Sequence, residues 1–233
     1  MKISVIIPAR NEAKNIYNVI EQIDPSVFEI IVIDGNSIDS TFDVAKSHPK
    51  CTKVFKQLSV GKGAALSRGF MESSGDLVIT LDADGSTDPA EIPFFVRAIN
   101  EGADLAKGSR NIFGGGSDDL TPFRNLGNLF LTTLANWLYG TKWTDIAYGY
   151  IAIRRDLLNK LNLSNLDKEN VKKMTYGSGF EIESLICCRS AKLGANIKEV
   201  PSHERSRWSG SSNLKAIPDG FRALFSIVKE KFY

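Results

Sequence analysis

The chain has 233 residues, enough to bury one hydrophobic core, and its 42% hydrophobic and 24% charged residues are typical of a folded globular protein. A formal net charge of +2 is too small to indicate nucleic-acid binding, so we expect no nucleic acid among its partners. Three cysteines and two histidines argue against a disulfide framework and against a zinc site.

The first half alternates short β-branched runs with segments of helical spacing. Helices are expected over Asn15–Ile23, from Asp39 or Ser40 onward, and over Lys62–Ser73. Strands are expected over Ile3–Ile7, Glu29–Ile33, Lys53–Phe55 and Leu77–Leu81. Because right-handed βαβ units place helices on both faces of a sheet, this order predicts an α/β fold with a mostly parallel central sheet flanked by helices.

The second half is less regular, and no linker-like stretch separates it from the first. The polar segment 162–178 and the run Gly114–Gly116 predict loops. Strands are expected over Asp104–Ser109, Tyr148–Ile153 and Ile197–Val200. Helices are expected over Leu126–Tyr139, Phe180–Lys192 (long and amphipathic) and Ala216–Lys231. We therefore expect a single domain over residues 1–233.

The strongest local signal for chemistry is Asp82-Ala83-Asp84, directly after the strand that ends at Leu81. Ligands of parallel α/β sheets bind beyond the carboxyl ends of the strands, where Asp34 is also expected. Two carboxylates one residue apart offer hard oxygen ligands to Mg²⁺ or Mn²⁺, and a nucleoside diphosphate would add further oxygens. The alternative reading is a loop that carries two solvated aspartates.

Two further motifs have a structural reading. Asp88, followed by Pro89 and Glu91, predicts a helix start with a capping box. Gly61-Lys62-Gly63 lacks the upstream glycine and the following Ser or Thr of a phosphate-binding loop. Tight packing at a helix start is therefore the role that we expect for these glycines.

Three arginines are candidates for phosphate contacts: Arg110, Arg124 and Arg207. The planar guanidinium group donates two parallel hydrogen bonds to phosphate oxygens, which a lysine cannot do. Arg207 lies in a Gly/Ser-rich segment with Gly210, which indicates a loop that closes over a ligand. The alternative for each of them is an ordinary surface arginine.

The motifs together resemble family 2 glycosyltransferases, and most of all the dolichol-phosphate mannose synthase branch. The first group comprises PARNE at 8–12, EIIVIDGNSIDST at 29–41, GKGAA at 61–65, Gly75-Asp76, Asp82-Ala83-Asp84 and Gly108-Ser109-Arg110. The later group comprises Thr144-Asp145, Gly149-Tyr150, FEIE at 180–183, Glu199-Val200-Pro201 and Arg207-x-x-Gly210-x-Ser212. The resemblance covers essentially the whole chain, and the ordered combination is more specific than any single motif.

This resemblance implies a GT-A fold in which residues 1–110 bind the nucleotide sugar and metal, and residues 111–233 bind the acceptor. Asp82 and Asp84 would hold Mg²⁺ or Mn²⁺. Gly85-Ser86 stands where mannose synthase relatives often carry Leu-Gln, so the sequence leaves the donor sugar and the metal surroundings open. The residues expected to bind substrate are Pro8, Arg10, Glu12, Asp34, Lys62, Asp82, Arg110, Arg124, Glu181 and Ser212.

The implied reaction is direct displacement with inversion, which moves a hexose from a GDP- or UDP-sugar to a polyprenyl or dolichyl phosphate. The residues expected to be catalytic are Asp84, Asp145 and Arg207. An ionised lipid phosphate needs no general base, whereas a sugar hydroxyl would use Asp145. A soluble transferase acting on a sugar hydroxyl of a glycan or glycolipid is therefore one alternative, and a non-catalytic nucleotide-sugar-binding protein is another. A nucleotidyltransferase is disfavoured, because PARNE lacks the glycines of its phosphate loop.

The C-terminal helix is predicted to be amphipathic, with Phe221, Leu224, Phe225 and Val228 on one side. Such a helix lies on a membrane surface or packs on its own domain. No apolar run is long enough to span a bilayer, and no signal-peptide pattern is present. We expect a cytoplasmic protein that is soluble or peripheral on the cytoplasmic face of the membrane, with a membrane partner as a further option. The sequence leaves the oligomeric state open.

Overall fold

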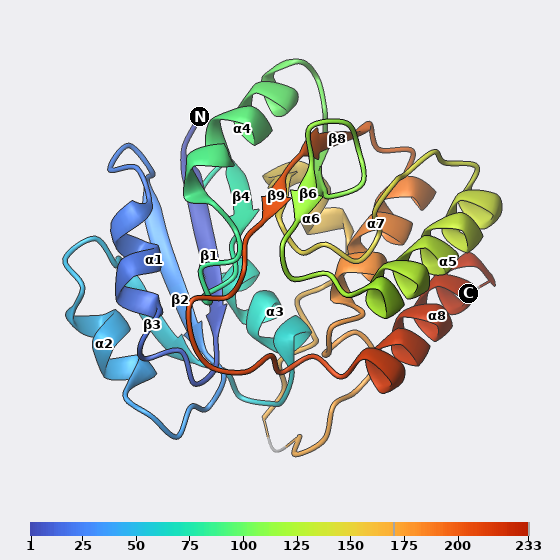
Figure 1. Ribbon diagram of the computed structural model, residues 1–233. Coiled ribbons are helices and arrows are strands. Elements are labelled where there is room, and N and C mark those ends of the chain that lie inside the picture. The colour runs from blue at the N-terminus through green and yellow to red at the C-terminus, as the bar shows by residue number, and fades with distance from the viewer. Residues whose placement is uncertain (170, 233) are drawn as a thin grey trace.

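A seven-stranded sheet forms the centre of the computed structural model, in the order β3-β2-β1-β4-β7-β5-β8 (Figure 1). The structure describes residues 1–169 and 171–232, so position 170 of the predicted loop and Tyr233 lie outside the described residues. The strands are β1 Ile3–Ala9, β2 Glu29–Asp34, β3 Lys53–Lys56, β4 Leu77–Thr80, β5 Leu105–Ser109, β7 Ile151–Arg154 and β8 Ile197–Pro201. All neighbouring strands run parallel except β7, which is antiparallel to β4 and β5.

Helices cover both faces of this sheet, as the βαβ pattern predicts (Figure 1). They are α1 Ile16–Gln22, α2 Thr41–Ser47, α3 Lys62–Glu72, α4 Ile92–Asn100, α5 Pro122–Tyr139, α6 Arg155–Lys160, α7 Ile182–Lys192 and α8 Ala216–Phe232. A short parallel pair, β6 Gly116–Ser117 with β9 His203–Glu204, lies outside the main sheet. Within the part of the chain that the structure describes, no helix is long and apolar enough to cross a bilayer.

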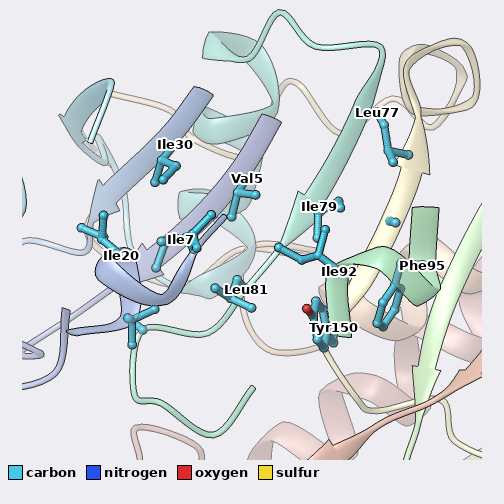
Figure 2. Close-up of a cluster of buried hydrophobic side chains, with 14 of the residues drawn as sticks. Val5, Ile7, Ile20, Ile30, Leu77, Ile79, Leu81, Ile92, Phe95 and Tyr150 are labelled. Carbon is cyan, nitrogen blue, oxygen red and sulfur yellow. The ribbon is translucent and has the colours of Figure 1, made fainter. Parts of the chain in front are cut away.

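Two hydrophobic clusters hold the helices against opposite faces of the sheet. Figure 2 shows the first cluster, in which aliphatic side chains of β1, β2 and β4 pack with Ile20 of α1 and with Ile92 and Phe95 of α4. The second cluster joins α3, α6 and α7 to the other face. All six residues of β2 are buried, which explains why this strand reads as a continuous apolar run rather than an alternating one.

Three local expectations have clear outcomes. The side chain of Asp88 accepts a hydrogen bond from Ala90 N at 3.0 Å, so its predicted helix-capping role is confirmed. The reciprocal half of the capping box is wrong, because Glu91 instead accepts hydrogen bonds from Ser202 and from His203 N. The predicted amphipathic character of α7 is also wrong. Apolar and polar side chains of this helix are almost all buried, so the helix has no extended solvent-facing side.

The glycines before and within the first turn of α3 are required by close packing, as expected. A Cβ on Gly61 would lie 2.2 Å from the carbonyl oxygen of Ser178. A Cβ on Gly63 would lie 2.0 Å from the carbonyl oxygen of Gly177. These contacts bring Lys62, between the two glycines, against the segment that leads into α7.

Glu29 generates a prediction about stability, because it is a buried carboxylate at the amino end of β2. Burial alone would raise the pKa of Glu29, but the Ser74 N–H, the Ser4 hydroxyl and Lys53 together lower it to about 2. A depressed folded-state pKa contributes stability that is complete above pH 4.5 and is lost as the pH falls towards 2. We expect Glu29→Gln to lower the free energy of unfolding at pH 7 by on the order of 2 kcal/mol.

Denaturant unfolding of both proteins between pH 7 and pH 3 checks this prediction. The difference between them should shrink on acidification, because wild-type Glu29 becomes protonated during unfolding. A difference that stays constant over this range would contradict the assignment.

Candidate active site

A cleft of about 980 Å³ opens where β1, β2 and β4 end, and both halves of the chain line it. Ala9 is the last residue of β1, Gly35 follows β2, and Asp82 and Asp84 follow β4. The cleft therefore lies beyond the carboxyl ends of parallel strands, as expected for this class of sheet. The predicted site residues that line it are Pro8, Arg10, Glu12, Lys62, Asp82, Asp84, Arg110, Arg124, Arg207 and Ser212.

Three predicted site residues lie behind the walls of the cleft: Asp34, Asp145 and Glu181, each no more than 1% exposed. Asp34 accepts a hydrogen bond from the backbone N–H of Ser37, in the turn after β2. Glu181 forms a two-pronged ion pair with Arg222 of α8, and Arg222 itself lines the cleft. In this structure these carboxylates support the lining rather than face the cleft.

The two aspartates of the Asp82-Ala83-Asp84 motif are each held by a cation. Asp82 Oδ1 lies 2.7 Å from Lys62 Nζ, and Asp84 Oδ2 lies 2.8 Å from an amino nitrogen of Arg207. The other oxygen of Asp84 accepts hydrogen bonds from the N–H and hydroxyl of Ser86. The chain thus gives each aspartate a positively charged partner and keeps both carboxylates at the cleft surface.

The donor set suits a hard divalent cation only in part. Carboxylate oxygens are the ligands that Mg²⁺ and Mn²⁺ prefer. Among residues 1–169 and 171–232, however, no group of three or more His, Cys, Asp or Glu side chains converges as a metal site. Asp82 and Asp84 fit an ion whose remaining oxygens come from the substrate and water, as is usual for Mg²⁺ with a diphosphate.

Lys62 bridges the motif to a residue that the sequence analysis did not single out as a site residue. Its Nζ lies 3.0 Å from Glu183 Oε1 of α7, in addition to its pair with Asp82. Burial alone would lower the pKa of Lys62, but Asp82 and Glu183 raise it, so the ammonium stays protonated. Burial raises the pKa of Glu183 despite the nearby Lys62.

The segment around Arg207 closes one side of the cleft. Arg207 donates to Glu12 Oε1 at 2.6 Å, and Ser209 donates to Asn15 at 2.7 Å. Trp208 covers Gly85, where a Cβ would lie 2.2 Å from the indole ring. Gly85 has φ of +84°, so both the backbone conformation and the contact with Trp208 favour glycine there.

Arg110 is held rigidly by a buried network. It makes two hydrogen bonds to Asp145, at 2.7 and 3.1 Å, and one to Glu204 at 3.1 Å. Burial alone would raise the pKa of Asp145, but Lys107 and Arg110 lower it to about 2. Asp145 is therefore a weak base that orients a guanidinium group.

A further group of cations and apolar side chains from α5, α8 and the segments before α7 and α8 lines the cleft. Arg124, in the first turn of α5, pairs with Asp119 at 3.0 Å. Lys215 and Arg222 line the cleft beside Leu214, Met174 and Pro218.

The cleft-lining residues that the sequence analysis did not name as site residues include Tyr148, Glu183, Glu204 and Arg222. Glu183 stands on a helix, where a carboxylate usually faces solvent. The signal in the sequence is Leu185-Ile186-Cys187-Cys188, four consecutive apolar residues that indicate a helix buried on every side, where a carboxylate needs a partner.

Comparisons with known proteins agree with this geometry. A family model described as glycosyl transferase family 2 matches residues 4–161. The chain is 31% identical to a dolichol-phosphate mannosyltransferase of Pyrococcus furiosus over 98% of its length, although it spans only 64% of that protein. It is 32% identical to a polyprenol monophosphomannose synthase of Mycolicibacterium smegmatis, with 90% of this chain and 80% of that protein covered. It is 29% identical to an undecaprenyl-phosphate mannosyltransferase of Micrococcus luteus, with 92% and 88% covered.

Solved structures identify the fold as GT-A. The glucosyl-3-phosphoglycerate synthase of Mycobacterium tuberculosis, in complex with Mn²⁺, UDP and glucosyl-3-phosphoglycerate, is similar at a TM-score of 0.74. That likeness covers 98% of this chain and 79% of the other at 24% identity, so it establishes the architecture alone. The family model covers more than half of the chain, and the expected resemblance is confirmed: the protein is a glycosyltransferase that belongs to family 2.

Proposed function

We propose that this glycosyltransferase moves a hexose from a nucleoside diphosphosugar to a polyprenyl phosphate, with inversion. One observation carries the proposal: a single cleft is lined by the Asp82–Asp84 pair with Arg110 and Arg207, and also by a second group of cations, Arg124, Lys215 and Arg222. Two clusters of positive charge suit two phosphate-bearing substrates, the donor diphosphate and the acceptor phosphate. The printed names of three curated relatives, all mannosyltransferases or mannose synthases acting on polyprenyl-type lipids, support the same acceptor.

The donor would occupy the end of the cleft formed by the first half of the chain. Pro8, Arg10 and Gly35 line this end, and we assign it to the nucleoside. Asp82 and Asp84 would hold Mg²⁺ or Mn²⁺, which when bound supplies positive charge to the departing diphosphate.

Two arginines would stabilise the same departing charge in different ways. Arg110 is held by Asp145 and Glu204, so it presents a fixed guanidinium edge. Arg207 pairs with Asp84 and Glu12 on a less buried segment, and a diphosphate would compete with these carboxylates for it.

The acceptor would occupy the end lined by Arg124, Lys215 and Arg222. A phosphate monoester is already ionised at neutral pH, so its oxygen attacks the anomeric carbon without a general base. Attack opposite the departing diphosphate inverts the configuration at that carbon. Asp145 then acts by holding Arg110, and we propose this positioning role in place of the general-base role.

An exposed apolar surface beside this end supports a lipid acceptor. Helices α5 and α8 lie side by side (Figure 1). Each carries a stripe of exposed apolar side chains, and we call the two stripes together the apolar helix face. The helices contact each other, and Tyr139 of α5 donates a hydrogen bond to the carbonyl oxygen of Ile227 of α8. The apolar helix face comprises Phe123, Leu126, Phe130 and Trp137 of α5, and Ile217, Phe221 and Phe225 of α8, each 58–79% exposed.

We propose that the apolar helix face rests on a membrane. Soluble proteins rarely leave so many large apolar side chains exposed together, and amphipathic helices bury such faces in the lipid headgroup region. On α8, Pro218 and Arg222 line the cleft while Phe221 and Phe225 are exposed, so one helix would connect the bilayer to the acceptor end.

A transfer assay tests the function. Purified protein with Mg²⁺ or Mn²⁺ is given a panel of UDP- and GDP-hexoses, with and without a short-chain polyprenyl phosphate. We expect metal-dependent hexose transfer to the lipid phosphate, with at least a 100-fold loss in Asp84→Ala because the diphosphate loses its counter-charge.

The other outcomes of this assay are informative. Turnover with a glycan or glycolipid acceptor alone would replace the lipid-phosphate proposal with transfer to a sugar hydroxyl. Nucleotide-sugar binding without transfer to any acceptor would favour a non-catalytic binding protein.

The positioning role of Asp145 predicts that Asp145→Asn lowers kcat/KM without changing the shape of its pH profile. We expect Asp145→Asn to lower kcat/KM by about 10- to 100-fold, because Arg110 loses its charged partner. Since the pKa of Asp145 is about 2, the profile of kcat/KM between pH 5 and 8 should keep its shape. Asp104→Asn, one residue before β5 and outside the cleft lining, serves as the control. An acidic limb in the wild-type profile that disappears in Asp145→Asn would restore the general-base role.

Membrane contact predicts that the protein floats with anionic phospholipid vesicles in a density gradient. We expect the double variant Phe221→Ser/Phe225→Ser to weaken this binding at least about tenfold, because two apolar side chains no longer enter the bilayer. The control is Phe94→Ser on α4, where the wild-type side chain is 58% exposed on another helix. Equal vesicle binding by all three proteins, or none by the wild type, would contradict the proposal.

A further inference from the structure

Glu183 is a buried carboxylate in the cleft that the proposed transfer does not use. It is 4% exposed and pairs with Lys62, which also pairs with Asp82. Three charged side chains from three parts of the chain therefore meet at one point with an excess of one negative charge. Burying such a group is costly unless it also binds something, since an apolar side chain of similar volume would hold α3 and α7 together at least as well.

The cluster lies where a transferred group would lie. The end of the cleft assigned to the nucleoside is lined by Pro8 and Gly35, and the acceptor end by Arg124 and Arg222. Asp82 belongs both to the carboxylate pair that faces the diphosphate and to the Lys62 cluster. In a transfer between two phosphate-bearing substrates, the group between the diphosphate and the acceptor is the sugar.

The backbone at Gly149 packs directly against the cluster. A Cβ on Gly149 would lie 2.8 Å from Lys62 Nζ and 2.9 Å from Glu183 Oε1. Thr80 fixes Gly149 by donating a hydrogen bond to its carbonyl oxygen at 2.6 Å. A side chain at position 149 would therefore displace the charged ends of Lys62 and Glu183, so glycine at this position keeps the cluster in place at the cleft.

The chemistry of the cluster matches a polyhydroxylated ligand. Each sugar hydroxyl donates one hydrogen bond and accepts others, so neighbouring hydroxyls pair well with a carboxylate beside an ammonium group. We propose that Glu183, Lys62 and Asp82 form a subsite for the hydroxyl groups of the donor hexose. Glu183 accepts from one hydroxyl, Lys62 donates to its neighbour, and Glu183 thereby determines which hexose is transferred. This assignment rests on the proposed function.

The test separates the sugar from the nucleotide. Purified wild-type protein and Glu183→Gln are titrated with UDP and GDP, and then assayed with the matching UDP- and GDP-hexoses in the presence of Mg²⁺ or Mn²⁺. We expect the nucleoside diphosphate affinity to change less than threefold, and kcat/KM for the preferred nucleotide sugar to fall by about 10- to 100-fold.

A matched control is available in Glu29→Gln. Glu29 is 3% exposed and pairs with Lys53 at 3.1 Å, much as Glu183 pairs with Lys62, but it lies at the opposite end of its strand from the cleft. It should lower stability without changing the ranking of the hexose donors.

Donor hexoses that lack one hydroxyl provide a second measurement. It uses the wild-type protein, so it can be made even if Glu183→Gln does not fold. At least one deoxy donor should react 10-fold or more slowly than its parent, and Glu183→Gln should lose that discrimination. Equal reaction of all deoxy donors, or an equal loss of nucleoside diphosphate and nucleotide-sugar binding in Glu183→Gln, would overturn the subsite.

The failure of the subsite can be told apart from the failure of the proposed function. If the wild-type protein binds no nucleotide at all, the proposed function fails and the subsite with it. If nucleotide binding is intact and the selectivity among hexose donors is unchanged in Glu183→Gln, the subsite alone is removed.

Discussion

The antiparallel pairing of β4 with β7 is the constraint on which the active site depends. The register places Thr80, the last residue of β4, opposite Ile151, the first residue of β7. Continued by two residues, this register brings Asp82 next to Gly149. The carboxylate motif of the first half thus meets the acceptor half, and Lys62 and Glu183 close around the meeting point.

The pairing of opposite charges within the cleft follows from that meeting. Each carboxylate that lines it near β4 is paired with a lysine or an arginine, since an unpaired charge at this depth would be costly. The pairs differ in rigidity. Arg110 is locked by Asp145 and Glu204, whereas Arg207 belongs to an irregular segment that connects β9 to α8. A phosphate-bearing substrate would therefore displace the carboxylate partners of Arg207 more easily than those of Arg110.

Helix α8 relates the chemistry to the surface of the molecule. Its first turns contribute Pro218 and Arg222 to the cleft, Glu181 anchors Arg222, and its exposed side is apolar. Helix α5 repeats the arrangement, with Arg124 at the cleft and aromatic side chains exposed further along. The end of the cleft assigned to the acceptor is therefore built by the same two helices that form the apolar helix face.

The sequence by itself determined the alternation of strands and helices, the single mostly parallel sheet, and the motif residues at the ends of β1, β2 and β4, because hydrophobic periodicity and strand-end motifs are local properties. Only the tertiary structure decided which charged residues share a space. Glu183 was invisible as a site residue because its partner Lys62 is distant in sequence, and Asp145 turned out to lie behind Arg110 rather than in the cleft. The exposed stripe on α5 was missed for the same reason, since a helix pattern shows an apolar side but not whether another element covers it.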